Sequence, residues 1–281
     1  MKRIKSFDNT HPVLYLIATP IGNLGEFSSR AIKIVEEMDI IAAEDTRNSG
    51  ELLSKFNIKK QLVSLREHNE VEASKNLIAQ IKAGKKVAYM SDAGYPGISD
   101  PGYILVKLAL ENDIAVSTIS GSSAFINALV RSGLDTAHFY FHGFLPPKDN
   151  EMKEELGQLK DKKETLIFYE SPHRIKRTLQ NLFEVLGNRR ASLQRELTKL
   201  NEENILGTLE ELKDLDESTL KGEMVIVVEG NNDKQDSLNE EKILELIELF
   251  LKHGVSKKDT IEIISESYNI RKNYLKDIIN K

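Results

Sequence analysis

Short apolar runs alternate with stretches of helical period between residues 13 and 229 of the chain. The first five apolar runs lie at 13–18, 40–43, 61–65, 87–90 and 115–119. Between the runs, apolar residues such as Ala31, Val35 and Met38 recur at three- or four-residue spacing, which is typical of amphipathic helices. Strands that alternate with helices indicate an α/β fold, in which crossover helices connect parallel strands. We therefore predict an N-terminal α/β domain over residues 11–130.

A second group of apolar runs follows the first. These runs lie at 139–144, 166–169, 191–194 and 224–229. They predict a smaller α/β domain over residues 131–231, and residues 1–10 ahead of the first domain are expected to form a flexible tail. Residues 231–239 are polar and suit a linker, and the helical periodicity beyond them predicts a C-terminal helical domain over 240–281. The turn at 251–258 separates two helical stretches, as in a helix-turn-helix or a plain helical hairpin.

Composition excludes several classes of protein. The 281 residues are 40% hydrophobic and 30% charged, which are globular proportions and exclude a disordered, collagen-like or coiled-coil chain. Cysteine is absent, so the chain has no disulfide and no cysteine nucleophile, and a reducing cytoplasm is the expected location. The apolar runs are far shorter than the roughly 18 residues that span a bilayer. The net charge of −5 excludes a general nucleic-acid coat, so any contact with RNA must be local.

Three loops follow predicted strands and are rich in glycine, proline or serine. They lie at 19–25, 90–102 and 120–124. Open α/β sheets bind ligands at the carboxyl ends of their strands, and glycine lets the backbone approach a ligand closely. The loops lack the dinucleotide-binding and phosphate-binding fingerprints, which disfavours NAD and ATP. A plain turn and a serine-rich helix start remain alternatives for the first and third loops. Within the second loop, Asp92 and Asp100 either bind a ligand or cap a helix, and we expect Asp100 to cap.

Four clusters of charged residues each follow an apolar run. They lie at 44–47, 66–70, 170–174 and 195–199. Each cluster alone is more often a surface ion pair or a helix cap, but four together predict that acids, histidines and bases surround one cleft. His68 and His173 have no paired-histidine spacing, so we expect no metal site.

Six segments occur in the order found in one known family. They are ATPIGNLGEFSSRA at 18–31, AAEDTR at 42–47, EHNE at 67–70, SDAGYPGISDPG at 91–102, FYESPHR at 168–174 and RELTK at 195–199. On these segments the chain resembles the bacterial small-subunit ribosomal RNA methyltransferases I, which are 2′-O-ribose methyltransferases of the tetrapyrrole methylase family. The resemblance covers about 13–230 and is looser over the tail, which is helix-turn-helix-like in that family.

The resemblance implies two α/β domains of the class III methyltransferase type, with S-adenosylmethionine bound between them. It also implies a cytoplasmic homodimer that methylates a cytidine ribose in the decoding region of 16S RNA, within the assembled 30S subunit. The cofactor contacts implied by the matching motifs fall on Ile21, Ala93, Gly94, Ile98, Ser123, Ala124, Tyr169 and Leu197.

The chain also departs from the family pattern at four positions. Tyr95 stands where threonine is usual, Ser120 and Ser122 stand where prolines are common, and Leu206 stands where an arginine precedes Gly207. Proline restricts the unfolded and folded backbone alike, so we expect its loss to loosen the turn near the cofactor and to weaken cofactor affinity.

Methyl transfer to a ribose hydroxyl requires alignment of the reacting atoms and removal of one proton. We expect the proton acceptor among Asp45, Glu170 and a Lys199 of lowered pKa. In related tetrapyrrole enzymes an acid after the second strand serves as the base, and Asp45, with Glu44 beside it, occupies that place.

RNA contacts require local positive charge. Residues 170–199 carry seven Lys or Arg against three acids, and residues 251–281 carry seven against four. The candidate RNA-binding residues are Arg47, His68, His173, Arg174, Arg177, Lys257 and Lys258, with Arg189 and Arg190 as further candidates. Two other functions stay open: methylation of a precorrin-type tetrapyrrole by the same fold, and a non-catalytic RNA-binding assembly factor that has kept a cofactor pocket.

Overall fold

The computed structural model describes residues 5, 12–232, 240–268 and 270–279. Apart from Lys5, the tail expected at 1–10 lies outside the described residues, as does most of the linker expected at 231–239. The chain divides into two compact units, Met1–Gly230 and Asn231–Lys281, and each is described by itself. No helix among the described residues is long and apolar enough to cross a membrane.

The first sheet has five parallel strands in the order β3-β2-β4-β1-β5. The strands are β1 (Val13–Ile17), β2 (Ile40–Ala43), β3 (Gln61–Ser64), β4 (Val87–Met90) and β5 (Ala115–Ile119). All five predicted runs form strands, and the predicted parallel pairing is confirmed. Every residue of β2 and β4 is buried, because helices cover both faces of the sheet, and this explains their unbroken apolar sequences.

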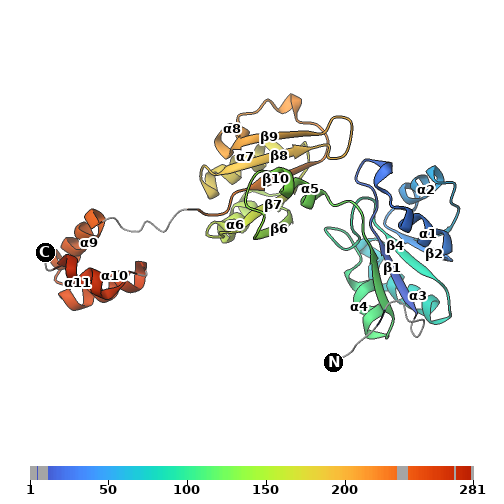
Figure 1. Cartoon of the computed structure of the whole chain (residues 1–281), viewed down its shortest axis with the longest axis horizontal. Helices are drawn as coiled ribbons and strands as arrows, with labels where there is room; N and C mark the ends of the chain where they lie inside the picture. The colour runs from blue at the N-terminus through green and yellow to red at the C-terminus, as the bar shows by residue number, and fades with distance from the viewer. Residues whose placement is uncertain (1–4, 6–11, 233–239, 269, 280–281) are drawn as a thin grey trace. The chain divides into compact units, whose positions relative to one another are not determined.

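Helices cover the first sheet on both sides (Figure 1). They are α1 (Ser29–Glu37), α2 (Thr46–Lys55), α3 (Glu70–Lys82) and α4 (Tyr103–Glu111), with short 3₁₀ turns η1 (Leu24–Glu26) and η2 (Glu67–Asn69). Side chains of α1 and α2 pack on the face that contains Ile17 and Ile41. Those of α3 and α4 pack on the opposite face, which contains Leu14 and Tyr89.

The second sheet is mixed and has the order β6-β7-β10-β8-β9. Its strands are β6 (Phe139–Phe144), β7 (Thr165–Glu170), β8 (Arg190–Arg195), β9 (Glu203–Thr208) and β10 (Met224–Val228). Only β6 and β7 run parallel, and the other neighbours are antiparallel. Strand β9 was not predicted, because this edge strand has no buried residue and its apolar Ile205 and Leu206 are flanked by polar residues and glycine.

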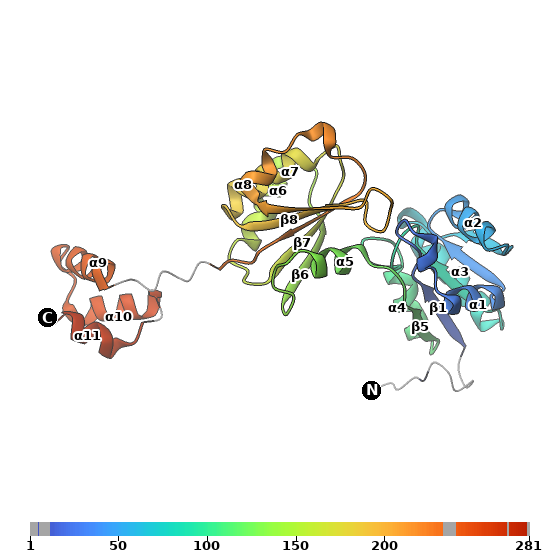
Figure 2. The same cartoon turned by 45° about the horizontal axis from the view of Figure 1, so that its top comes forward.

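Helices α6 (Asp149–Leu159), α7 (Ile175–Leu186) and α8 (Leu209–Lys213) cover one face of the second sheet, and the 3₁₀ turn η3 (Glu217–Thr219) follows α8. Helix α5 (Ala124–Arg131) covers the other face, as Figure 2 shows. Ala128 and Leu129 of α5 pack there against Val225 and Val227 of β10. The helix that follows the first sheet therefore packs on the second, which holds the loop at 120–124 between the two sheets.

The second unit has three helices, α9 (Glu240–Lys252), α10 (Lys257–Tyr268) and α11 (Lys272–Ile279). They enclose a small core of their own. Its buried members are Ile243, Ile247, Ile261, Ile264, Leu275 and Ile278. The predicted helical character of this region is confirmed, and the turn predicted at 251–258 lies between α9 and α10.

Candidate active site

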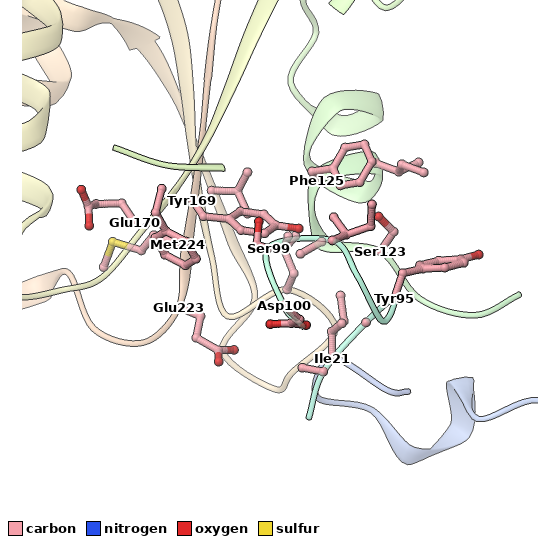
Figure 3. Close-up of a pocket in the computed structure, with 18 of the residues that line it drawn as sticks. Ile21, Tyr95, Ser99, Asp100, Ser123, Phe125, Tyr169, Glu170, Glu223 and Met224 are labelled. Atoms are coloured by element: carbon pink, nitrogen blue, oxygen red, sulfur yellow. The ribbon is translucent and has the colours of Figure 1, made fainter. Parts of the chain in front are cut away.

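A cavity of about 520 Å³ opens between the carboxyl ends of the first sheet and the second sheet (Figure 3). It is lined by loops that follow β1, β4 and β5, and by residues of β7 and β10. All eight residues that the resemblance assigns to the cofactor line it: Ile21, Ala93, Gly94, Ile98, Ser123, Ala124, Tyr169 and Leu197. Ile21 and Leu197, which lie 176 positions apart in the sequence, thus meet at one apolar surface.

Backbone hydrogen bonds join the loops that follow β1 and β4. The Thr19 N–H donates to the Gly94 carbonyl at 2.9 Å, and the Gly94 N–H donates back to the Thr19 carbonyl at 3.1 Å. The buried Thr19 hydroxyl also donates to the Ser91 carbonyl at 3.2 Å. Gly94 adopts a φ of 77°, a left-handed conformation that glycine reaches without steric cost. This bridge fixes the backbone on which Ile21 and Ala93 are carried.

Two departures from the family pattern tie the loop at 120–124 in place. The Ser122 hydroxyl donates to the Glu26 carboxylate, and the Gly121 N–H donates to the Tyr95 hydroxyl at 3.2 Å. A Cβ on Gly121 would lie 2.9 Å from the Ala18 Cβ, so the loop also packs closely on the end of β1. The expected loosening of this turn stays a prediction, and the Ser122 hydroxyl supplies one restraint of its own, a hydrogen bond, where a proline ring is common in the family.

The start of α5 faces the same cavity. Its N-cap residue, Ser123, makes no side-chain hydrogen bond to the helix, so the first N–H groups are not capped from within. Burial raises the pKa of Tyr169 to about 12, although the Phe125 N–H hydrogen bonds to its hydroxyl and acts in the opposite direction. Tyr169 therefore stays a neutral hydroxyl beside the helix N-terminus at physiological pH.

A second cavity of about 640 Å³ adjoins the first. It is lined by Glu44, Asp45, Arg66, Glu67, His68, Glu70, Asp92, Ser99, Asp100 and Pro101. The charged clusters at 44–47 and 66–70 meet here, whereas those at 170–174 and 195–199 contribute to the first cavity. The predicted convergence of four clusters on one rim is thus divided between two neighbouring cavities.

Asp45 is held by two arginines in this second cavity. Its carboxylate accepts from Arg47 Nη2 at 2.6 Å and Arg66 Nη2 at 3.4 Å, and it caps α2 by accepting the Arg47 N–H at 2.9 Å. Hydrogen bonds from Arg47 hold the pKa of Asp45 well below its usual range. A carboxylate of such low pKa is a weak general base, so the geometry favours a positioning role for Asp45.

Glu170 and Lys199 are also occupied by neighbouring groups. Glu170 is only 3% exposed, and its carboxylate accepts from the Ser171 N–H at 2.7 Å and from the Thr178 hydroxyl at 2.6 Å. Lys199 Nζ lies 2.9 Å from Glu196 and 3.1 Å from Glu223. Burial acts to lower the pKa of Lys199, but the hydrogen bonds to these two glutamates outweigh it and raise the pKa. The lowered pKa expected for Lys199 is therefore wrong.

Asp100 does not cap a helix, contrary to expectation. The Glu70 carboxylate takes that place at the start of α4, accepting from the Gly102 N–H at 2.8 Å and the Ile104 N–H at 2.9 Å. Burial, followed by the charges of Glu44 and Asp92, raises the pKa of Asp100 to about 7. The sequence gives no sign of this, because burial is not visible in it and Glu44 comes from another loop, although Asp92 lies only eight residues before Asp100 in the same loop.

Burial also raises the pKa of Glu44, whose carboxylate accepts the Asp92 N–H at 3.4 Å. The acidic wall of the second cavity therefore contains two carboxyl groups, Glu44 and Asp100, whose proton affinity exceeds that of a free carboxylate.

The candidate RNA-binding residues lie in three places. His68 lines the second cavity, and Arg47, with an 85% exposed side chain, is bonded to Asp45 of that lining. Arg174 and Arg177 donate to backbone carbonyls at 145–147, so they brace that loop as well as carrying charge, and His173 is exposed beside them. The exposed Lys257 and Lys258 begin α10 in the separate helical unit. Of the further candidates, Arg189 donates to backbone carbonyls and Arg190 is exposed on β8.

Among the described residues, no group of three or more His, Cys, Asp or Glu side chains could hold a metal ion.

Comparisons with known proteins agree with this architecture. The model of the tetrapyrrole (corrin/porphyrin) methylases matches residues 13–213. Curated relatives named ribosomal RNA small subunit methyltransferase I include one from Halalkalibacterium halodurans, 50% identical over 79% of this chain and 77% of the relative. Another, from Haemophilus influenzae, is 43% identical over 94% of both chains.

Solved structures with the same fold include a diphthine synthase, with a TM-score of 0.60 at 18% identity, covering 78% of this chain and 89% of that one. A uroporphyrin-III-C-methyltransferase from Thermus thermophilus has a TM-score of 0.54 at 18% identity, covering 78% and 94%. At this identity the two likenesses concern the fold alone.

Proposed function

The chain belongs to the tetrapyrrole methylase family, and on this premise we propose that it uses S-adenosylmethionine to 2′-O-methylate a cytidine ribose in the decoding region of 16S ribosomal RNA. The observation that carries the proposal is the meeting of all eight expected cofactor residues in one cavity, in a chain 40–50% identical to several ribosomal RNA small subunit methyltransferases I. The proposed setting is a cytoplasmic homodimer acting on the assembled 30S subunit.

The first cavity fits the proposed cofactor in size and in chemistry. Its volume of about 520 Å³ lies within the roughly 300–1,000 Å³ of small-ligand pockets. Ile21, Ile98 and Leu197 give it an apolar wall for a nucleoside, and the uncapped start of α5 offers N–H groups to a carboxylate. When bound, S-adenosylmethionine supplies an electrophilic methyl group on a positively charged sulfur.

The chain's own residues then have two tasks, which are to exclude water and to position positive charge. Apolar side chains around the first cavity keep water away from the methyl group, because water would otherwise compete with the ribose hydroxyl as the methyl acceptor. Asp45 holds Arg47 and Arg66 in fixed positions at the second cavity, where their charge suits RNA phosphate. Lys199 and Glu223 pair across the edge of the first cavity, and the Lys199 side chain packs over Gly22 in the loop after β1.

A labelling experiment tests the proposal. The protein is incubated with methyl-labelled S-adenosylmethionine and, in separate reactions, with 30S subunits, naked 16S RNA or a precorrin-type tetrapyrrole. We expect label in RNA, recovered by nuclease digestion and mass spectrometry as 2′-O-methylcytidine. Label in the tetrapyrrole would replace the proposal with small-molecule methylation. Binding of subunits without any label would replace it with a non-catalytic assembly role.

A further inference from the structure

Two adjoining cavities in the first unit share part of their lining. The first carries the proposed cofactor residues, and the second carries the charged clusters at 44–47 and 66–70. Among the described residues that line them, Ser99 and Asp100 are the two that belong to both. A group that passes from a ligand in one cavity to a ligand in the other must therefore pass beside these two side chains.

We propose that Asp100 is the catalytic residue that accepts the proton of the ribose 2′-hydroxyl, with the target nucleoside seated in the second cavity; this inference rests on the proposed function. The 2′-oxygen forms a bond to the methyl carbon as the carbon–sulfur bond breaks. The electron pair of that bond remains on the sulfur, which becomes a neutral thioether, and the hydroxyl proton moves to the Asp100 carboxylate. Solvent in the open second cavity then takes up the proton.

The placement of Asp100 fits this role. Figure 3 shows its carboxylate pointing into the first cavity, in the space between Ile21 and Glu223 and beneath the ring of Tyr169. Asp100 does not cap α4, because Glu70 already accepts from the N–H groups there. An acid in a Gly- and Pro-rich loop, free of a capping role and set at the junction of two ligand cavities, is well placed to touch the reacting atoms.

The other three candidates are less suited to accept a proton. Asp45 is paired with two arginines, and Lys199 is paired with two glutamates. Glu170 is buried, and its carboxylate is taken up by Ser171, Thr178 and Arg174. The Asp45 and Glu170 carboxylates already accept hydrogen bonds, and Lys199 would first have to release its own proton from these ion pairs.

Burial, and then the charges around Asp100, set its proton affinity close to neutral pH. Glu44, which follows β2, and Asp92, which follows β4, both oppose its ionisation, while a hydrogen bond with Ser91 favours it. Tyr89 and Tyr169 also face Asp100, and both stay protonated because burial raises their pKa values. A base whose pKa lies near the working pH combines a large ionised fraction with strong proton affinity, which is the optimum for general-base catalysis.

Single-turnover methylation of 30S subunits tests the assignment, with Asp100→Asn as the variant. The matched control is Asp161→Asn; Asp161 is an exposed aspartate just after α6 and lines neither cavity. We expect Asp100→Asn to lower the rate by about 10²–10⁴-fold, the usual contribution of a general base. Wild type and control should show a rate that rises with pH through about 7 and then levels off, and the residual rate of Asp100→Asn should lack this step.

Two readouts that do not depend on methylation accompany the rate. Calorimetry with S-adenosylmethionine should give Asp100→Asn an affinity within about threefold of wild type, and carboxyl ¹³C chemical shifts should show an acid of pKa near 7 that is missing from the variant. A rate for Asp100→Asn within threefold of an active wild type would overturn the inference. So would a loss of rate that is explained wholly by weaker cofactor binding, or an Asp100 carboxyl group that titrates below pH 5. A wild type that binds cofactor but methylates neither 30S subunits nor naked 16S RNA would instead refute the proposed function.

Discussion

The raised pKa of Asp100 predicts that the protein loses stability as the pH rises, and that Asp100→Asn removes this loss. The folded protein holds the Asp100 proton up to about pH 7, whereas the unfolded chain releases it near the ordinary aspartate pKa of 3.8. A raised carboxyl pKa means that its stabilising contribution is complete below the unfolded pKa and disappears as the pH rises through the folded value. Asparagine cannot ionise, so the variant should gain on wild type between these limits.

The size of the effect follows from the same two pKa values. A change from 3.8 to about 7 corresponds to about 4 kcal/mol, of which about 2.6 kcal/mol falls between pH 5 and pH 8. The Asp100 side chain is only partly buried, and solvent screens such interactions strongly, so we expect about 1 kcal/mol to remain.

Urea unfolding followed by circular dichroism measures this quantity. The free energy of unfolding of Asp100→Asn, minus that of wild type, should be about 1 kcal/mol larger at pH 8 than at pH 5. The Asp161→Asn control should show no such difference, because that aspartate is exposed. A difference below about 0.3 kcal/mol for Asp100→Asn would refute the idea that Glu44 and Asp92 oppose the ionisation of Asp100.

Three further changes test other parts of the molecule. Glu70→Ala removes the carboxylate that caps α4 and should cost about 1–2 kcal/mol in urea unfolding, whereas Glu72→Ala, an exposed neighbour on the same helix, should change stability by less than about 0.5 kcal/mol. Asp45→Asn releases two arginines and should weaken 30S binding. At saturating 30S, it should lower the single-turnover rate far less than Asp100→Asn does. An equal loss of rate in the two variants would show that Asp45 acts as a base. Deletion of 240–281, the proposed helical domain, should weaken 30S binding and flatten its dependence on salt, and an unchanged slope would remove this region from the RNA footprint.

The two strands β2 and β4 of the first sheet were the most predictable from the sequence because they are buried on both faces. Strands β2 and β4 are covered on both sides, so every position must be apolar and each strand appears as an isolated run. Strand β9 shows the reverse case. It lies at the edge of its sheet, it has no buried residue, and its polar Glu203 and Asn204 resemble a loop. Burial accounts for β2, β4 and β9, whereas β3, an edge strand that also has no buried residue, was found from its apolar Leu62 and Val63.

The three loops that line the first cavity were predictable from their glycine, proline and serine residues after strands, and the resemblance added Tyr169 and Leu197, whereas the roles of individual acids were not predictable. Motif matching placed Ile21 and Leu197 at one ligand because a family motif preserves which residues meet in space. The cap of α4 comes from Glu70, which lies 32 residues before Gly102, and no local rule of helix capping looks so far along the chain. An acid near a helix start was therefore assigned to the cap when another acid had already filled that place.

The contrast between Asp45 and Asp100 explains how one acidic cavity can hold carboxylates with opposite behaviour. Both residues follow strands of the first sheet and both line the second cavity. Two arginines neutralise Asp45, so it stays ionised, and its charge is directed toward Arg47 and Arg66. Burial, and then the charges of its acidic neighbours, oppose the ionisation of Asp100. Glu44 and Asp100 are thus the two carboxyl groups of this cavity with raised proton affinity, and of the two only Asp100 also lines the first cavity. Arginines fixed by Asp45 beside a carboxyl group of raised pKa allow RNA phosphate to be bound and a ribose hydroxyl to be activated at the same place.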